Sequence, residues 1–186
     1  MSDKQVLVPL AQGCEEIEAV TVIDLLVRAG IDVVTASLDD QQTIKASRGV
    51  QLIAQTTLSQ VEDIPFDMIV LPGGMPGADN LNNSDLLHTM LQKTIVAGDF
   101  VAAICAAPKV LVSAGLLDNK QATSFPGVID KNPAPNMSYR DDSVVIDGQI
   151  ITSRGPGTAI LFALTLIELL AGESVKQSVA NSLQLP

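Results

Sequence analysis

Short apolar runs alternate along this chain with longer segments whose apolar residues recur at helical spacing. Runs rich in Val, Ile and Leu predict strands, because such side chains suit the pleated surface of a sheet. The strands are expected at 6–10, 32–37, 67–74 and 100–105. Helices are expected to begin at Glu15, Ser84, Pro108 and Gly157. This alternation is typical of a mostly parallel sheet with helices on both faces, since parallel neighbours need a crossover helix.

Two further runs alternate between apolar and polar residues and are each broken by a tight turn. They cover 43–54 and 143–153, and the second contains the hairpin dipeptide Asp147-Gly148. Both predict antiparallel edge or flap strands. The chain has no internal repeat, and its one proline-rich stretch is too short to separate domains. We therefore expect one α/β domain over 1–186, with a flavodoxin-like doubly wound, mostly parallel sheet, helices on both faces and a small antiparallel hairpin.

Composition narrows the possible partners and location. The 186 residues are 47% hydrophobic and include no Trp, so the core must be built mainly from aliphatic side chains. The chain has 11 basic and 21 acidic residues, and its formal net charge of -10 argues against nucleic acid as a partner. It carries no cleavable apolar segment at its amino terminus and no run of about 18 apolar residues. We therefore expect a soluble cytoplasmic protein with no membrane partner.

Cysteine usage indicates a reactive thiol rather than a disulfide. Cys14 and Cys105 are far apart in a chain long enough to fold without a staple. Cys105 stands in "AAICAAPKVL", where an apolar strand ends and Pro108 suits the first turn of a helix. The amides that open such a helix stabilise a thiolate. Cys14 is expected to be dispensable for catalysis, because a free cysteine is often simply packed. Its place at the start of the Glu15 helix, in a turn near the expected pocket, also allows a secondary redox role.

The usual activator of a catalytic thiol is an imidazole, and this chain has one histidine. His88 lies in a predicted helix that Ser84 could cap, with Leu87 and Leu91 on its core stripe. A position on the helix surface is therefore favoured for His88, and another group must tune Cys105.

A cluster of carboxyl groups opens the helix that follows the first strand. Glu15, Glu16 and Glu18 complement the helix dipole there, which is their simplest role. Glu18 also shares a helical face with Val22 and Leu25, so it would be drawn toward the apolar interior. Burial would raise its pKa, and a protonated carboxyl can donate a hydrogen bond to a thiolate. Glu16 shares an apolar face in the same way, so periodicity does not choose between the two.

Two glycine-rich turns precede or follow predicted elements. Gly73 and Gly74 either serve a turn that needs positive φ or bring backbone amides close to an anion or oxyanion. Arg154 and two glycines stand before the last long helix, and these glycines too could serve only a turn. Neither turn decides a function alone.

Taken together, these segments resemble the DJ-one/ThiJ/PfpI superfamily, and its DJ-one branch above all. The resemblance rests on "EEIEAVTVIDLLVRAGIDV", "ASRGV", "VLPGGMPGADNL", "AAICAAPKVL" and "TSRGPGTA", which occur in the family's order and spacing over nearly the whole chain. It implies that Cys105 is an oxidisable nucleophile and that Glu18 is the protonated acid beside it. It also implies backbone amides from Gly74 and Ala106, with Gly73 beside them, for an oxyanion or a sulfinate.

The resemblance further implies an anion site next to a homodimer contact. Arg28 and Arg48 match the family's anion-binding arginines there, and Glu15 is assigned to the same region. The predicted helix 15–28 supports a dimer on its own, because its apolar side chains point in nearly every direction and a sheet covers only one face. We expect a second copy of this helix as its partner, with Asp24 and Arg28 meeting across the axis and Arg48 brought toward the neighbour's pocket.

Three positions depart from the family pattern. Ala106 stands where protease-like relatives place His, so peptidase activity loses its base. Phe125 occupies a position where animal relatives carry His, which removes an imidazole as acid or base. Leu161 stands where an acidic residue is usual, so a polar contact of that helix is expected to be missing.

The resemblance implies an enzyme of the glyoxalase III type that needs no cofactor and no metal and converts small α-oxoaldehydes such as methylglyoxal, with water, to hydroxy acids such as lactate. The same pocket would remove early adducts of these aldehydes from glycated protein, as a protein deglycase. The competing hypothesis is a redox-responsive stress protein or chaperone in which Cys105 is oxidised to a sulfinate, with little or no turnover. Both hypotheses need the same thiol and the same carboxyl.

Overall fold

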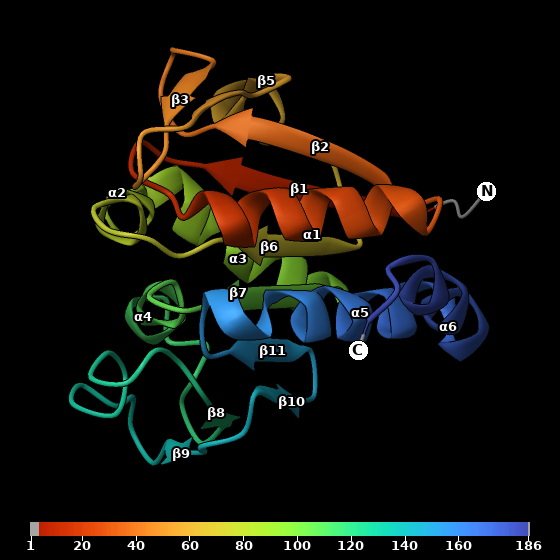
Figure 1. The fold of residues 1–186 in the computed structure, drawn as a ribbon. Helices are drawn as coiled ribbons and strands as arrows, with labels where there is room; N and C mark the ends of the chain where they lie inside the picture. Colours follow the sequence, from red (N-terminus) through yellow and green to blue (C-terminus); the bar gives the residue numbers. More distant parts are fainter. Residues whose placement is uncertain (1–3, 186) are drawn as a thin grey trace.

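The computed structural model describes residues 4–185, and a seven-stranded sheet runs through its centre (Figure 1). All neighbouring strands in it are parallel except β10, which runs antiparallel to β11. In spatial order the strands are β10 (Val144–Asp147), β11 (Ile150–Ser153), β7 (Phe100–Ile104), β6 (Met68–Leu71), β1 (Gln5–Leu10), β2 (Asp32–Ser37) and β5 (Thr56–Thr57). The central strands are buried on both faces, which explains their continuous apolar sequences. The predicted mostly parallel α/β sheet is confirmed.

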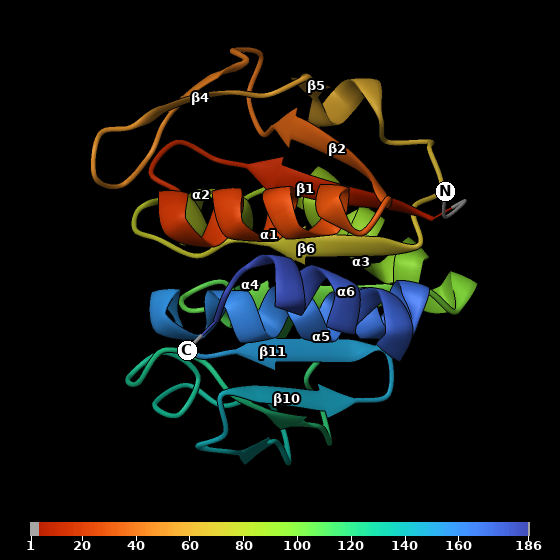
Figure 2. The ribbon, with the colours of Figure 1, turned by 45° about the vertical axis from the view of Figure 1, so that its right-hand side comes forward.

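Helices cover both faces of this sheet (Figure 1). One face is covered by α1 (Glu16–Arg28) and α5 (Ala159–Ala171), with α6 (Glu173–Ser182) packed against α5 (Figure 2). The other face is covered by α2 (Gly77–Asn82), α3 (Asp85–Ala97) and α4 (Pro108–Ser113). Each face has its own aliphatic core, so the fold is doubly wound as expected.

Most predicted helices begin within one residue of the expected position. The exception is the last long helix, which was expected from Gly157 and is preceded by the 3₁₀ turn η2 (Pro156–Thr158). Ser84 caps α3 as predicted, since its hydroxyl accepts the amide of Leu87 at 3.2 Å. His88 is half-buried on α3, and its Nε2 lies 3.0 Å from the carbonyl oxygen of Asn82, which fits a structural role.

The two alternating runs form the two predicted hairpins. β3 (Thr43–Lys45) pairs antiparallel with β4 (Gln51–Ile53) in a small separate sheet, and Asp147-Gly148 turns β10 into β11. The expected edge position is wrong for β11, which pairs with β7 on its other side and is buried at all four residues. Three short elements complete the chain: η1 (Leu58–Gln60), β8 (Gln121–Ala122) and β9 (Ser138–Tyr139).

The order of the strands decides where the functional segments meet. The chain passes from β1 to β2 on one side and returns to β6 on the other side of β1. The start of α1, the glycine-rich loop after β6 and Cys105 after β7 therefore leave the same edge of the sheet. This edge is the carboxyl edge, where the sequence predicts a site.

Candidate active site

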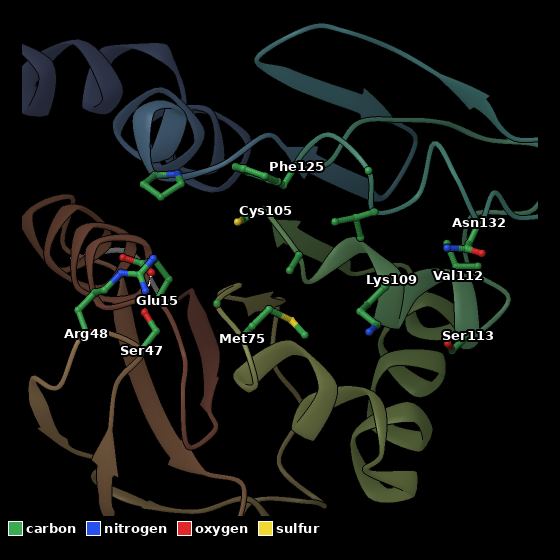
Figure 3. A pocket seen from close by; sticks show the side chains of 15 residues that line it. Glu15, Ser47, Arg48, Met75, Cys105, Lys109, Val112, Ser113, Phe125 and Asn132 are labelled. Atoms are coloured by element: carbon green, nitrogen blue, oxygen red, sulfur yellow. Dashed lines mark hydrogen bonds between the residues drawn. The ribbon is translucent and has the colours of Figure 1, made fainter.

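A cavity of about 630 Å³ opens at this carboxyl edge (Figure 3). We call it the Cys105 cavity. Its lining comes from the start of α1, the β3–β4 hairpin, the loop after β6, the turn and helix after β7, the loop that begins at Phe125, and the turn before α5. The lining residues are Glu15, Ser47, Arg48, Gly74, Met75, Cys105, Ala106, Lys109, Val112, Ser113, Phe125, Gly127, Val128, Asn132 and Pro156.

Cys105 occupies a strained turn between β7 and α4. Its φ is 63°, a conformation in which a residue with a side chain is uncommon. Hydrogen bonds from two neighbouring segments hold it there: its amide donates to the carbonyl of Ser153 and its carbonyl accepts the amide of Phe125, each at 2.9 Å. The surrounding fold therefore imposes the conformation that presents the thiol to the cavity.

Glu18 is the carboxyl that lies beside Cys105. It is fully buried on α1, and its Oε2 accepts the amide of Gly73 at 2.8 Å. A Cβ on Gly73 would lie 2.7 Å from Cys105 Cβ and 2.8 Å from Glu18 Oε2, so a glycine is needed for the two side chains to meet. Burial raises the pKa of Glu18 to about 7. Its Oε1 has no hydrogen-bond partner of good geometry among residues 4–185, which leaves this oxygen to carry the proton.

Glu16, the alternative that periodicity left open, has a different role. Although burial opposes its ionisation, hydrogen bonds from its own amide, from the amide of Arg48 and from Ser47 hold the pKa of Glu16 below its ordinary value. The Arg48 amide lies 3.0 Å from Oε1, and the Ser47 hydroxyl lies 3.0 Å from Oε2. Glu16 thus anchors the β3–β4 hairpin to α1.

The pKa of the Cys105 thiol is raised, whereas the amino end of a helix alone would lower it. Burial, followed by the charge of Glu18 and the hydrogen bond to it, raises this pKa to about 12. The amides of Gly74 and Ala106 donate toward the sulfur and act in the opposite direction. A protonated Glu18 carries no charge and can donate to the sulfur, so it would favour the thiolate. The thiol and the carboxyl therefore titrate as one pair.

The backbone amides of Gly73, Gly74 and Ala106, which the resemblance assigned to one oxyanion site, have two different roles. Those of Gly74 and Ala106 reach the sulfur, whereas that of Gly73 is used by Glu18. The assignment of Gly73 to an oxyanion site is therefore wrong, because its one N–H is already bonded. Gly74 has a φ of 89°, and a Cβ there would lie 2.4 Å from the amide nitrogen of Glu15, so no side chain fits.

The wall formed by α1 and the β3–β4 hairpin is polar. Glu15 is buried, and its Oε2 accepts the Ser47 hydroxyl at 2.6 Å. Arg48 is exposed and lines the cavity beside Glu15 (Figure 3). Arg28 lies at the far end of α1, where its Nε bonds to Asp24 Oδ2 of the same helix at 2.6 Å. The structure thus brings Arg48 to the cavity of its own chain and keeps Arg28 away from it.

Several lining residues were not predicted. Lys109 and Ser113 are one turn apart on α4, a spacing that could have indicated a shared face. Lys109 also forms an ion pair with Asp79 of α2. Val128 and Asn132 come from an irregular loop whose sequence carries no periodic signal.

The remaining candidate positions are placed as follows. Phe125 lines the cavity, whereas Leu161 is exposed on α5 outside it. Cys14 is fully buried outside the cavity, and burial together with the charge of Glu16 raises its pKa to about 12. Residues 4–185 contain no cluster of three or more His, Cys, Asp or Glu side chains that could hold a metal. Nor does any helix within this range have the length and apolarity to cross a membrane.

The sequence and the fold of this chain are similar to those of known proteins. Residues 4–169 match the DJ-1/PfpI family. The chain is 44% identical to "Protein DJ-1 homolog A" of Arabidopsis thaliana over 98% of this chain and 47% of that protein, so it spans about half of that relative's length. It is 34% identical to "Glutathione-independent glyoxalase DJR-1.2" of Caenorhabditis elegans, over 94% of this chain and 92% of that protein. The crystal structure of Drosophila melanogaster DJ-1beta matches with a TM-score of 0.95 and 45% identity, over 100% of both chains.

Proposed function

The chain belongs to the DJ-1/PfpI family, and from this premise we propose that it converts small α-oxoaldehydes to hydroxy acids with Cys105 as the nucleophile and without a cofactor. The observation that carries the proposal is the arrangement at the sulfur: a buried carboxyl, two converging amides and an open cavity around one thiol. A relative of similar length is named a glutathione-independent glyoxalase.

The reaction needs one nucleophile, one proton carrier and a binding site for negative charge. The Cys105 thiolate adds to the aldehyde carbon and forms a hemithioacetal, and the new oxyanion accepts hydrogen bonds from the amides of Gly74 and Ala106. Glu18 gives its proton to this oxygen, and the resulting carboxylate removes the proton from the former aldehyde carbon. The hydroxyl proton passes to the ketone oxygen and Glu18 returns its proton to the neighbouring carbon, which leaves a thioester and an alcohol. Water then hydrolyses the thioester, which gives the hydroxy acid and regenerates the thiol. The sum is methylglyoxal plus water to lactate.

The pKa of Glu18 suits this task. A group that takes up and returns a proton near neutral pH works best when its pKa lies near the working pH, and burial brings Glu18 to about 7. An ordinary exposed carboxyl would be too weak a base.

The size of the cavity supports adducts as further substrates. At about 630 Å³ it falls within the range of roughly 300–1,000 Å³ that holds drug-sized ligands, far more than a three-carbon aldehyde fills. We include protein deglycation in the proposal for this reason, with the glycated side chain entering from the exposed rim formed by Ser113 and Asn132.

The test is steady-state kinetics with methylglyoxal, glyoxal and a glycated peptide, with buffer adducts controlled. Turnover should vanish in Cys105→Ala. It should persist in Cys14→Ser, because Cys14 is buried outside the cavity. Full activity in Cys105→Ala would refute the proposal.

A redox function is the second candidate, and the same two amides favour it. A sulfinate on Cys105 would accept hydrogen bonds from Gly74 and Ala106 and from the protonated Glu18. Absence of turnover, together with selective addition of two oxygens to Cys105 by peroxide, would support this candidate instead. Intact mass and peptide mapping would locate the oxygens.

We also propose that the protein is a homodimer through α1. The helix leaves Ile17, Val20 and Val27 exposed by 55%, 47% and 56%, on the side that its own sheet does not cover. A second copy would bury this apolar surface and could bring Arg28 near the partner's cavity. Asp24 and Arg28 already pair within one helix, so the predicted cross-axis pairing is not needed to satisfy them.

Light scattering at micromolar concentration should give twice the chain mass of 19.5 kDa. Val20→Glu should dissociate the dimer and lower activity. Val96→Glu is the matched control, because Val96 is 88% exposed on α3, on the opposite face of the sheet. A fully active monomer would contradict the proposal.

A further inference from the structure

A second cavity, of about 330 Å³, lies next to the Cys105 cavity, and Arg154 is the cation that lines it. We call it the Arg154 cavity. Its lining residues are Phe125, Pro126, Ser143, Arg154, Gly155, Pro156, Gly157 and Thr158. Phe125 and Pro156 line both cavities, so these two residues separate them.

Phe125 forms a thin partition. The position that a Cβ on Gly155 would occupy lies 3.4 Å from Cδ2 of the Phe125 ring and 4.0 Å from Cys105 Sγ. The ring is half exposed, so a change of its rotamer costs little packing. A ligand that reacts at Cys105 can therefore extend past the ring into the Arg154 cavity.

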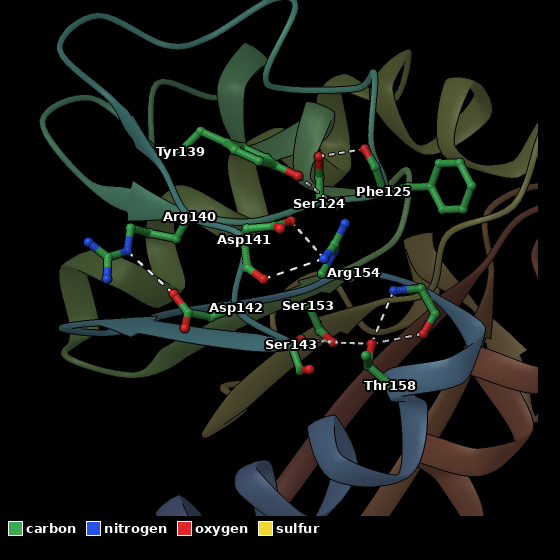
Figure 4. Close-up of polar contacts among 11 residues, drawn as sticks. Ser124, Phe125, Tyr139, Arg140, Asp141, Asp142, Ser143, Ser153, Arg154 and Thr158 are labelled. Atoms are coloured by element: carbon green, nitrogen blue, oxygen red, sulfur yellow. Dashed lines mark hydrogen bonds and ion pairs between the residues drawn. The ribbon is translucent and has the colours of Figure 1, made fainter.

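The guanidinium of Arg154 has unused donors. Its Nη1 contacts Asp141 Oδ1 at 2.7 Å and the Asp141 carbonyl at 3.4 Å (Figure 4). Within residues 4–185, no hydrogen bond uses its Nε or Nη2. The Asp141 side chain is 79% exposed, and an exposed ion pair of this kind is weak. An incoming anion can thus replace or join Asp141 at small cost.

Hydrogen bonds hold the turn that forms the cavity wall beside Arg154. The Thr158 hydroxyl lies 2.7 Å from Ser153 Oγ, accepts the Gly155 amide at 3.1 Å and donates to the Gly155 carbonyl at 2.9 Å (Figure 4). These bonds fix the turn that precedes α5, a helix of 13 residues whose amino end also favours negative charge.

We propose that the Arg154 cavity is a carboxylate subsite, and that the substrates include α-oxoaldehydes that carry a carboxylate at the end remote from the reactive carbonyls. This proposal rests on the proposed function, because it places the aldehyde at Cys105. A carboxylate matches the forked donors of one guanidinium. A phosphate dianion would need a second cation, and Arg154 is the only one among the residues that line this cavity in the described part of the chain. Phe125, Pro126 and Pro156 supply apolar contact for an aromatic or aliphatic spacer.

The first experiment tests the subsite without any reaction. Benzoate is titrated into ¹⁵N-labelled protein, and the amide signals of Gly155, Gly157 and Thr158 are followed by NMR. Arg154→Gln should weaken benzoate binding about tenfold or more, since a charge-assisted hydrogen bond is lost. Asp141→Asn should strengthen binding, because it removes the competing carboxylate.

The matched control is Arg140→Gln. Arg140 belongs to the same segment and pairs with Asp142 at 3.4 Å, but it does not line the cavity. It should leave benzoate binding unchanged. The proposal is refuted if benzoate shifts the signals of Gly74 and Ala106 rather than those of the Arg154 cavity, if Arg154→Gln binds as well as the parent, or if the parent binds no benzoate.

The second experiment compares phenylglyoxal with 4-carboxyphenylglyoxal as substrates. Arg154→Gln should raise KM about tenfold for the carboxylated compound and less than twofold for phenylglyoxal. Equal effects on both would assign Arg154 a merely structural role and overturn the proposal. If the parent turns over methylglyoxal but neither compound, the substrate part of this proposal is refuted. If it turns over none of the three, the proposed function fails, while the benzoate titration still decides whether the subsite exists.

Discussion

Replacing Glu18 by Gln tests whether Glu18 is protonated or ionised when the Cys105 thiol is ionised. Gln is uncharged and nearly isosteric, its amide oxygen can still accept the Gly73 amide, and its NH₂ can still donate to the sulfur. The substitution therefore removes only the ability of the side chain to ionise. The sign of the resulting change in the Cys105 pKa then separates two states of Glu18.

The two states predict changes of different size and sign. If Glu18 is protonated beside the thiolate, Gln replaces one neutral donor by a weaker one, and the Cys105 pKa should rise by about one unit or less. If Glu18 is ionised there, Gln removes a repulsion between two adjacent charges, for which we take a separation of about 4 Å. At an effective dielectric constant of about 20 this repulsion is about 4 kcal/mol, so the pKa should fall by about three units. We expect the small rise, because the amides of Gly74 and Ala106 favour the thiolate and Glu18 Oε1 has no other partner in residues 4–185, which leaves it free to hold the proton.

The assay is the rate of alkylation of Cys105 by iodoacetamide against pH, with the Cys14→Ser background to remove the second thiol. Glu18→Leu serves as the control without a donor, and it should raise the Cys105 pKa further than Gln does. A fall of about three units in Glu18→Gln would refute the assignment of the proton to Glu18.

Further predictions concern stability, the glycine turn, the second cysteine and the pH profile. The folded-state pKa of Glu18, about 7, lies above its ordinary value of 4.5. The protonated Glu18 side chain therefore contributes to stability below pH 4.5, and this contribution is lost as pH rises through 7. Denaturant unfolding should show that the parent loses about 3 kcal/mol relative to Glu18→Gln between pH 4.5 and 8. Gly74→Ala should destabilise by more than about 2 kcal/mol and abolish activity, whereas Gly30→Ala, at a φ of 75° with open space around it, should cost only about 1 kcal/mol; equal thermal shifts would contradict the clash. Peroxide should oxidise Cys105 before the buried Cys14, and equal loading in peptide maps would count against the site. The methylglyoxal kcat/KM should rise through a pKa near 7 and then stay level to about pH 9. A fall above pH 7 would show that the pair loses its last proton there, which contradicts a proton shared between the two groups.

Sequence patterns predicted the sheet well because parallel strands are buried on both faces. β1, β6 and β7 are continuous apolar runs for this reason. The same logic explains the failures. α2 has six residues, too few for a periodic pattern, and α6 buries only Val179. β11 alternates in sequence like an edge strand, but it lies between two strands and under α5.

Local sequence predicts some residues of the site, whereas contacts between distant segments decide the others. Cys105 was predictable because the strand-to-helix junction is a local feature of the sequence. The choice of Glu18 over Glu16 was not, since both lie on apolar faces of one helix. It was decided by the Gly73 amide, which reaches Glu18 from a loop 55 residues further along the chain. Arg154 was visible in the sequence, but the cavity beside it depends on Phe125, a neighbour that only the fold supplies.

One proton serves both members of the Cys105–Glu18 pair near neutral pH, so the form with thiolate and acid and the form with thiol and carboxylate differ only in where that proton lies. Their ratio does not depend on pH, because no proton is exchanged with solvent when one form converts to the other. The ratio depends instead on the hydrogen bonds around each group. The Gly73 amide favours the carboxylate, whereas the amides of Gly74 and Ala106 favour the thiolate. The backbone geometry of this loop and turn, together with the charge of Glu15, which raises the pKa of Glu18, therefore sets how much nucleophile the protein holds ready.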